Sequence, residues 1–492
     1  MSRNLIFYTL VIAIFGSVLW LVFNQGAKLE VLQSPQTGAG QTQELTSAEN
    51  PVEASIQGSA IVIFFRSLFQ NLEHPLSLLL IQIVVIVISS KLLASLVSKI
   101  GQPVVIGEVI AGILLGPSVL GHFWPGVSQF IFQAASLPNL NFLSQLGLIL
   151  FMFIIGLELD IHLLKHKAHT AVVVSHASII IPFAMGVSLA YFIYARFAPP
   201  HISFLAFGLF MGIAMSITAF PVLARILLER GLTKTALGSL AITCAAADDV
   251  TAWCILAAVI AIVQAGSGIS ALFTVLLSII YVIAMLKIVR PWLERLETQY
   301  TSTESLNKTF AVVAFVILFL SALTTEVIGI HALFGAFLAG ATMPAHASFR
   351  KLLASRIEDV SLVILLPLFF AFTGLKTQIG LLNDGTTWLV CGLIIFVAVA
   401  GKFGGSSLAA KFTGQSWSDS FALGALMNTR GLMELIVLNL GYDLGVLSPT
   451  VFTMMVLMAL VTTFMTAPAL YWIERIRWKL EATSVKSLPE RL

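Results

Sequence analysis

Two adjacent carboxylates, Asp248 and Asp249, lie near the middle of an apolar run that covers residues 236–264. The run is long enough to cross a bilayer. An acid at the centre of a spanning helix costs about 2.5–3.5 kcal/mol on insertion scales. An acid in this position therefore indicates a functional site by default. The two residues lie about 100° apart around a helix and therefore face different neighbours. We expect one to face a water-filled cavity and the other to meet a cationic side chain.

Three other charged residues within apolar runs are candidates for a role beside the acid pair. Lys402, in the run 387–411, is a candidate partner for one of the two acids, although a lysine near a span end can also snorkel to the interface. Arg430 and Glu434 are four residues apart, so they pair with each other or leave Arg430 to hold an acid elsewhere.

A carboxylate that holds either a hard cation or a proton, and that crosses the membrane only when occupied, exchanges one for the other. The acid pair therefore predicts antiport. The simpler hypothesis is that the two aspartates only bond to neighbouring hydroxyls or cap a helix break.

The elements that must position these residues are membrane helices. Of the 492 residues, 58% are hydrophobic and only 10% are charged, whereas a soluble domain has about 25% charged residues. The sequence has no P-loop, nucleotide fingerprint, nucleophile elbow or zinc-ligand spacing. We therefore predict a polytopic membrane protein that is not an enzyme, uses no cofactor, binds no nucleic acid and takes its energy from an ion gradient.

The chain divides into four predicted regions. Residues 1–24 are an N-terminal hydrophobic segment, read as an anchor or a signal-like helix. Residues 25–74 have a linker composition and end in an interfacial helix at 59–72. Residues 75–473 form the membrane domain, and residues 474–492 form a short tail.

Thirteen spans are predicted in the membrane domain. They lie near 75–98, 103–120, 141–160, 168–197, 203–228, 236–264, 270–288, 308–326, 329–343, 358–377, 387–411, 417–440 and 449–473. Basic residues concentrate in alternate loops, and the opposite loops have almost none beyond Arg196 and Lys376. By the positive-inside rule the basic loops and the C-terminus are cytoplasmic, in a bacterial inner or internal membrane.

The two halves of the membrane domain show internal similarity. Residues 151–158 in the third span resemble 368–376 in the tenth, and 107–117 in the second resemble 329–344 in the ninth. Both pairs are seven spans apart, and an odd offset inverts the second copy, as in the inverted repeats of secondary transporters.

By the same pairing the fifth span matches the twelfth, and both contain candidate helix interruptions. The first lies at 216–221, where Pro221 lacks an N–H and frees the carbonyl of Ile217, and the second lies around Gly431. The predicted fold is all-α, with inverted repeats and two broken, crossing helices.

These residues resemble the monovalent cation:proton antiporter-2 family, which includes sodium/proton and potassium/proton exchangers. The resemblance covers most of residues 75–473. It rests on Gly107–Pro117 (GEVIAGILLGP), the pair Asp248-Asp249, Gly329–Gly340 (GIHALFGAFLAG) and Asn428–Leu435 (NTRGLMEL).

The resemblance implies a homodimer that serves pH homeostasis, with a fixed dimerisation domain and a core of spans four to six and eleven to thirteen that moves like an elevator. It implies that Asp249 binds the transported Na⁺ or K⁺ and the proton, that Asp248 is the second acid, and that Lys402 is a salt-bridge partner. Thr218, Ser216 and neighbouring carbonyls would complete the ion site. An Asp pair implies electrogenic exchange.

Two other functions stay open from the sequence. A sodium-coupled organic-anion symporter of similar architecture would need a roomier substrate cavity. A cation channel would conduct far faster than a carrier, and broken, inverted helices argue against it.

Overall fold

The computed structural model describes residues 13–14, 16–22, 71–72, 74–158, 168–232, 235–264, 268–300, 304–344 and 347–486. Within these ranges the chain consists of helices and short connections, without a strand. Ten helices in the described part of the chain are long and apolar enough to cross a membrane. The remaining predicted spans are the two interrupted ones and the short apolar helix at Ala332–Thr342. The predicted all-helical, polytopic fold is confirmed.

The helices follow the predicted spans closely. In the first half they are α3 (Pro75–Lys99), α4 (Val104–Leu115), α7 (Leu137–Glu158), α9 (Ala168–Phe197), α10 (Phe204–Ser216), α11 (Phe220–Glu229) and α12 (Ala236–Gln264). In the second half they are α13 (Gly268–Ala284), α15 (Glu304–Ile328), α16 (Ala332–Thr342), α18 (Leu366–Lys376), α19 (Gly385–Val399), α20 (Gly405–Phe412), α21 (Trp417–Met427), α22 (Leu432–Asp443) and α23 (Pro449–Lys486).

Several shorter elements join or extend these helices. They are α5 (Leu120–Phe123), α6 (Pro125–Ile131), α14 (Arg290–Tyr300), α17 (Ala347–Val360), the 3₁₀ turn η4 (Ile379–Leu381), and the π-helical turns η2 (Met285–Val289), η3 (Ser361–Leu365) and η5 (Ala400–Gly404). Residues 16–22 are helical, whereas most of the predicted interfacial helix at 59–72 lies outside the described residues.

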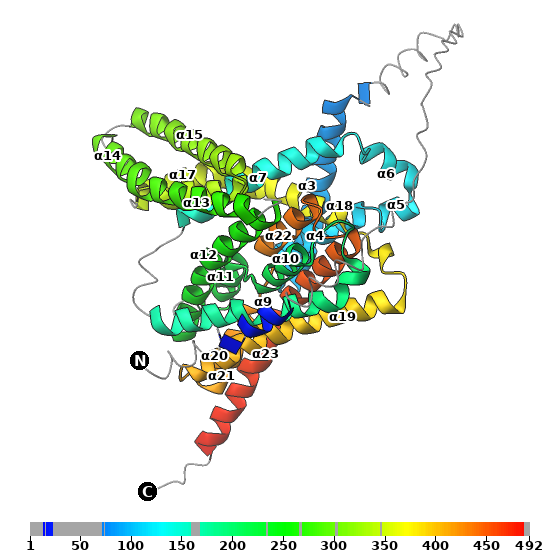
Figure 1. Cartoon of the computed structure of the whole chain (residues 1–492), viewed down its shortest axis with the longest axis vertical. Helices are drawn as coiled ribbons and strands as arrows, with labels where there is room; N and C mark the ends of the chain where they lie inside the picture. Colours follow the sequence, from blue (N-terminus) through cyan, green and yellow to red (C-terminus); the bar gives the residue numbers. More distant parts are fainter. Residues whose placement is uncertain are drawn as a thin grey trace.

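The helices pack most extensively within two groups. We call α9, α10, α11, α12 and α19 to α23 the core unit, and α3, α4, α7, α15, α16 and α18 the frame unit. Helices α13, α14 and α15 lie together on one flank, and the end of α23 extends away from the bundle (Figure 1).

Glycines in the two repeated motifs make equivalent contacts in the frame unit. A Cβ on Gly112 of α4 would lie 2.1 Å from the carbonyl oxygen of Ala371 in α18, and one on Gly156 of α7 would lie 2.2 Å from that of Phe337 in α16. Only glycine allows the helix backbones to approach so closely. The crossings α4–α18 and α7–α16 are therefore the same contact made twice, as the inverted pairing requires.

Both predicted helix interruptions are present, and they cross. The chain is non-helical at 217–219, between α10 and α11, and at 428–431, between α21 and α22. The amide of Ala219 donates to the carbonyl of Thr429 over 2.9 Å, which ties one break to the other. Gly431 adopts φ 151°, a conformation that side chains disfavour. Pro221 lies in the first turn of α11, where its missing N–H costs no hydrogen bond.

Candidate functional site

Asp248 is fully buried and accepts hydrogen bonds from four side chains. Lys402 Nζ lies 2.7 Å from its Oδ2, and the Thr218 hydroxyl donates to the same oxygen over 2.5 Å. The other oxygen, Oδ1, accepts from Ser178 at 2.7 Å and from Ser175 at 3.1 Å. Lys402 is also fully buried. A buried charge is tolerated when it is paired and hydrogen-bonded, and both conditions are met here.

A π-helical turn in the middle of its span presents Lys402 to this site. The turn η5 widens the helix between α19 and α20, and π-bulges of this kind often occur at functional sites. A Cβ on Gly401 would lie 2.9 Å from the Cα of Pro182, so the turn packs closely against the proline in α9. The ammonium also donates to the carbonyls of Ser178, at 2.9 Å, and of Ser216. The Ser216 carbonyl is one of those that the helix break leaves free.

Asp249 has a different environment. Only 4% of it is exposed, and its Oδ1 accepts no hydrogen bond from any described residue. The four hydrogen bonds described above all go to its neighbour Asp248. The structure thus separates the two acids into one carboxylate that is held and neutralised and one that has an unoccupied oxygen.

The remaining predicted ion ligands lie around Asp248. The Thr218 hydroxyl lies within reach of both Asp248 and the carbonyl of Met427, at 3.1 Å. The Ser216 hydroxyl instead donates to Gly212 in its own helix, at 2.6 Å. The part of Ser216 that reaches the site is therefore its carbonyl.

Arg430 adopts the first of the two arrangements that the sequence left open, in which it pairs with Glu434. Its Nη1 lies 3.2 Å from Glu434 Oε2, and both side chains are fully buried. Neither carboxylate oxygen of Glu434 accepts a hydrogen bond from a described residue. Arg430 instead donates to the carbonyls of Ala214 and Met215, at 2.9 and 2.7 Å. It therefore neutralises the carboxyl end of α10 just before the break, where the helix dipole is negative.

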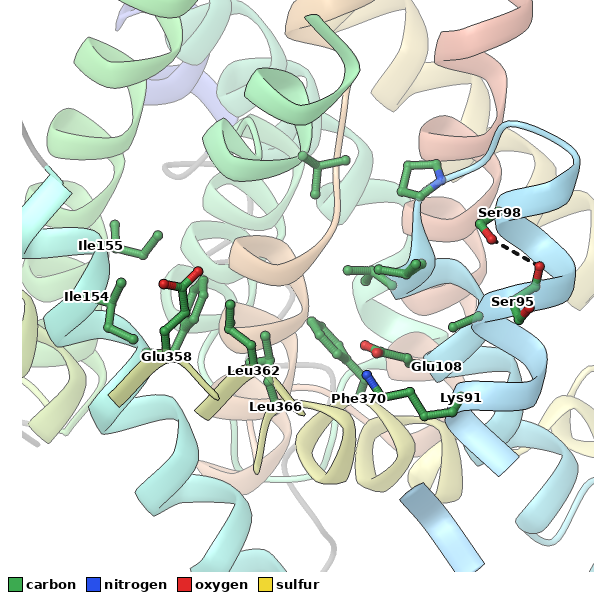
Figure 2. A pocket seen from close by; sticks show the side chains of 16 residues that line it. Lys91, Ser95, Ser98, Glu108, Ile154, Ile155, Glu358, Leu362, Leu366 and Phe370 are labelled. Carbon is green, nitrogen blue, oxygen red and sulfur yellow. Dashed lines mark hydrogen bonds between the residues drawn. The ribbon is translucent and has the colours of Figure 1, made fainter. Parts of the chain in front are cut away.

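The space around the crossing is open on one side of the protein and filled on the other. A cavity of about 590 Å³ lies among α3, α4, α7 and α18, and Val222 of α11 reaches it from the core unit. Val222 also packs beside Gly431, so one residue that lines the cavity contacts the crossing. Figure 2 shows Glu108 and Lys91 on one side of the cavity and Glu358 on the other.

The opposite side is closed by aromatic packing. Trp253, one turn beyond Asp249 in α12, stacks on Phe337 of α16 with ring centroids 6.4 Å apart. Trp253, Leu333 and Leu440 help to line a cavity of only about 10 Å³ at this point. The two units are thus sealed against each other at Trp253, whereas a cavity lies between them at Val222.

Sequence reasoning missed Ser175 and Ser178, the two α9 donors to Asp248. Serines three residues apart share a face of a helix, and this spacing was the available signal. Serines are also common at helix contacts in membranes, so the spacing does not single out these two.

Comparison with known proteins places the chain in a family. Residues 63–472 match the family described as sodium/hydrogen exchanger, transmembrane. The chain belongs to this exchanger family. Its membership confirms the resemblance seen in the sequence, and cation/proton antiport is the activity at the family level.

The exchanger is similar to proteins from several kingdoms. It is 44% identical over 396 residues to the Na(+)/H(+) antiporter NhaS4 of Synechocystis, covering 80% of this chain and 97% of that one. It is 39% identical to the Cation/H(+) antiporter 17 of Arabidopsis thaliana over 86% of this chain, and 36% identical to the K(+)/H(+) antiporter 1 of Saccharomyces cerevisiae over 81%. The chain spans about half the length of these plant and yeast relatives.

A solved structure supports the same fold. The sodium proton antiporter MjNhaP1 from Methanocaldococcus jannaschii superposes with a TM-score of 0.57 at 16% identity, covering 79% of this chain and 94% of that one.

Proposed function

We propose that the protein exchanges Na⁺ or K⁺ for protons and that Asp249 is the carboxylate that binds either one. The observation that carries the proposal is the buried, unpartnered Oδ1 of Asp249 beside a fully bonded Asp248. Hard cations take oxygen ligands, and a carboxylate can lose a cation only by gaining a proton or another cation in so dry a site. The names of two relatives, a Na(+)/H(+) antiporter and a K(+)/H(+) antiporter, agree with this chemistry.

In this proposal the Asp248–Lys402 pair stabilises the structure of the ion site and does not itself bind the transported ion. Lys402 neutralises Asp248 and bonds to the carbonyl of Ser216 at the break. It therefore holds α9, α10 and α12 together at the site, with Thr218 fixed against Asp248. Because Asp248 keeps its partner, the charge that changes during exchange is that of Asp249.

Alternating access follows from the two units. We propose that the core unit slides against the frame unit like an elevator and that the open cavity faces the cytoplasm, together with the C-terminus, because its rim adjoins the basic loops. We also propose a homodimer built on the frame unit. Cross-linking of the protein in native membranes tests the dimer.

The test uses the purified protein in proteoliposomes, with pH-sensitive dye and imposed Na⁺, K⁺ or Li⁺ gradients. Asp249→Asn should abolish exchange, while Asp384→Asn, an acid outside the site, should retain it. Both variants should elute as folded protein. Full exchange in Asp249→Asn would refute the assignment. A voltage dye then shows whether charge moves in each cycle.

A further inference from the structure

Two side-chain hydrogen bonds between described residues of α18 and α22 connect the core unit to the frame unit on the sealed side of the protein. Asn439 Nδ2 donates to Thr373 Oγ1 over 2.7 Å, and Lys376 Nζ donates to Asp443 Oδ1 over 2.6 Å. Thr373 and Lys376 belong to α18 of the frame unit, whereas Asn439 and Asp443 belong to α22 of the core unit. We call these two contacts the polar ladder.

The ladder has the spacing of one helical turn. Its α22 members are four residues apart and its α18 members are three apart, so each helix presents one face to the other. The contacts follow in the same order along both helices, first Thr373 with Asn439 and then Lys376 with Asp443. The helices α18 and α22 therefore run parallel here. A slide of about 5.4 Å along the common axis would therefore bring each α22 residue to the place of the next.

One member of the ladder has an unused acceptor. Asn439 is 3% exposed, and its Oδ1 has no hydrogen-bond partner among the described residues. A buried amide oxygen without a donor is costly, so a second arrangement that supplies one gains free energy. If α22 moves one turn toward its Asp443 end, Asn439 arrives where Asp443 now meets Lys376. The lysine can then donate to the orphaned oxygen.

Lys376 is also suited to hold the observed arrangement. Its side chain is 14% exposed and lies over the rings of Phe372 and Tyr442, with the ammonium 4.7 and 5.1 Å from their centroids. Cation–π contacts of this kind add to the ion pair. The contact is thus stronger than a typical exposed salt bridge but can still be exchanged for another.

We propose that the polar ladder has two registers and sets which side of the membrane the ion site faces. In the observed register Lys376 binds Asp443 and the site is sealed at Trp253. In the shifted register Lys376 binds Asn439 Oδ1, and the seal opens. This inference rests on the proposed elevator motion and assigns it a one-turn step, of the kind in which one packed element moves past another.

Cysteine cross-linking tests the shift directly. After the native cysteines Cys244, Cys254 and Cys391 are replaced by alanine, Thr373→Cys with Leu435→Cys places thiols together only in the shifted register, since Leu435 precedes Asn439 by four residues. Cross-linking of this pair in native membranes gives the shifted population.

Three further changes are compared in that background. Asp443→Asn removes the ion pair of the observed register and should raise the cross-linked fraction relative to the free fraction by about 5- to 30-fold. Asn439→Leu removes the acceptor of the shifted register and should lower that ratio. Asp384→Asn is the matched control, because Asp384 pairs with Arg196 at 2.9 Å on the same side but entirely within the core unit. It should leave the ratio unchanged.

The outcomes separate the ladder from the transport function. A ratio that does not respond to Asp443→Asn, or that responds equally to Asp384→Asn, overturns the ladder even if exchange is normal. Should the Leu435→Cys variant fail to fold, the apparent cation affinity measured from each face of the vesicle replaces it. Asp443→Asn should then change the two affinities in opposite directions, and equal changes would overturn the proposal. Cross-linking is measured without a gradient, so it remains informative if Asp249 proves not to be the ion ligand.

Discussion

Replacing Lys402 by methionine should expose how strongly the buried pair at the site depends on both partners. The substitution keeps the apolar stem and removes the ammonium, which leaves the fully buried Asp248 with only its three hydroxyl donors. Breaking a buried ion pair from one side costs about 3–5 kcal/mol, because the other charge stays buried without compensation. Total stabilities are about 5–15 kcal/mol, so the loss is a large share.

The expected shift in melting temperature follows from the size of the chain. An unfolding entropy of about 2.1 cal/mol/K per residue gives roughly 1 kcal/mol/K for the 492-residue chain, so Lys402→Met should melt about 3–5 °C lower. The assay is thermal unfolding in detergent, followed by the monodisperse fraction in size-exclusion chromatography.

A double-mutant cycle isolates the interaction. Asp248→Asn added to Lys402→Met removes the uncompensated charge and should recover most of the lost stability. Lys411→Met makes the same chemical change one helix further on, where the ammonium contacts a tryptophan ring and a carbonyl, and should cost about 1 kcal/mol or less. Strictly additive losses from the two site mutations would refute the idea that Lys402 and Asp248 stabilise each other.

Three further predictions concern two glycines at helix crossings and one helix cap. Gly112→Ala drives a Cβ to 2.1 Å from a backbone carbonyl of α18 and should destabilise the frame unit in the same melting assay, whereas Gly404→Ala, with open space around it, should be nearly neutral. Gly431→Ala forces a side chain into φ 151° at the crossing, which should cost about 1–3 kcal/mol and slow exchange. Hydrogen bonds from the first turn of α19 lower the pKa of Asp384 from 3.8, so its contribution to stability is present above that pH and is lost as the pH falls through the lower folded value. Melting curves between pH 3 and 5 should show this loss in the wild type and not in Asp384→Asn.

Much of the fold was determined by the sequence itself. Apolar runs of about 20 residues must cross the bilayer as helices, because no other structure satisfies the backbone there except a closed barrel. The two breaks were marked locally, by Pro221 and by Gly431, and the glycine motifs fixed the close crossings of the frame unit. Membership of the exchanger family was likewise evident from residues contiguous in the chain.

The tertiary structure decided how the acids at the site differ. Spacing along α12 shows that Asp248 and Asp249 face different neighbours, but only the rotation of α12 against α9 and η5 determines which acid meets Lys402. The same packing brings in Ser178 from α9 and turns the hydroxyl of Ser216 away from the site. Such choices depend on how helices rotate and shift against one another, and these degrees of freedom are set by contacts between residues far apart in the sequence.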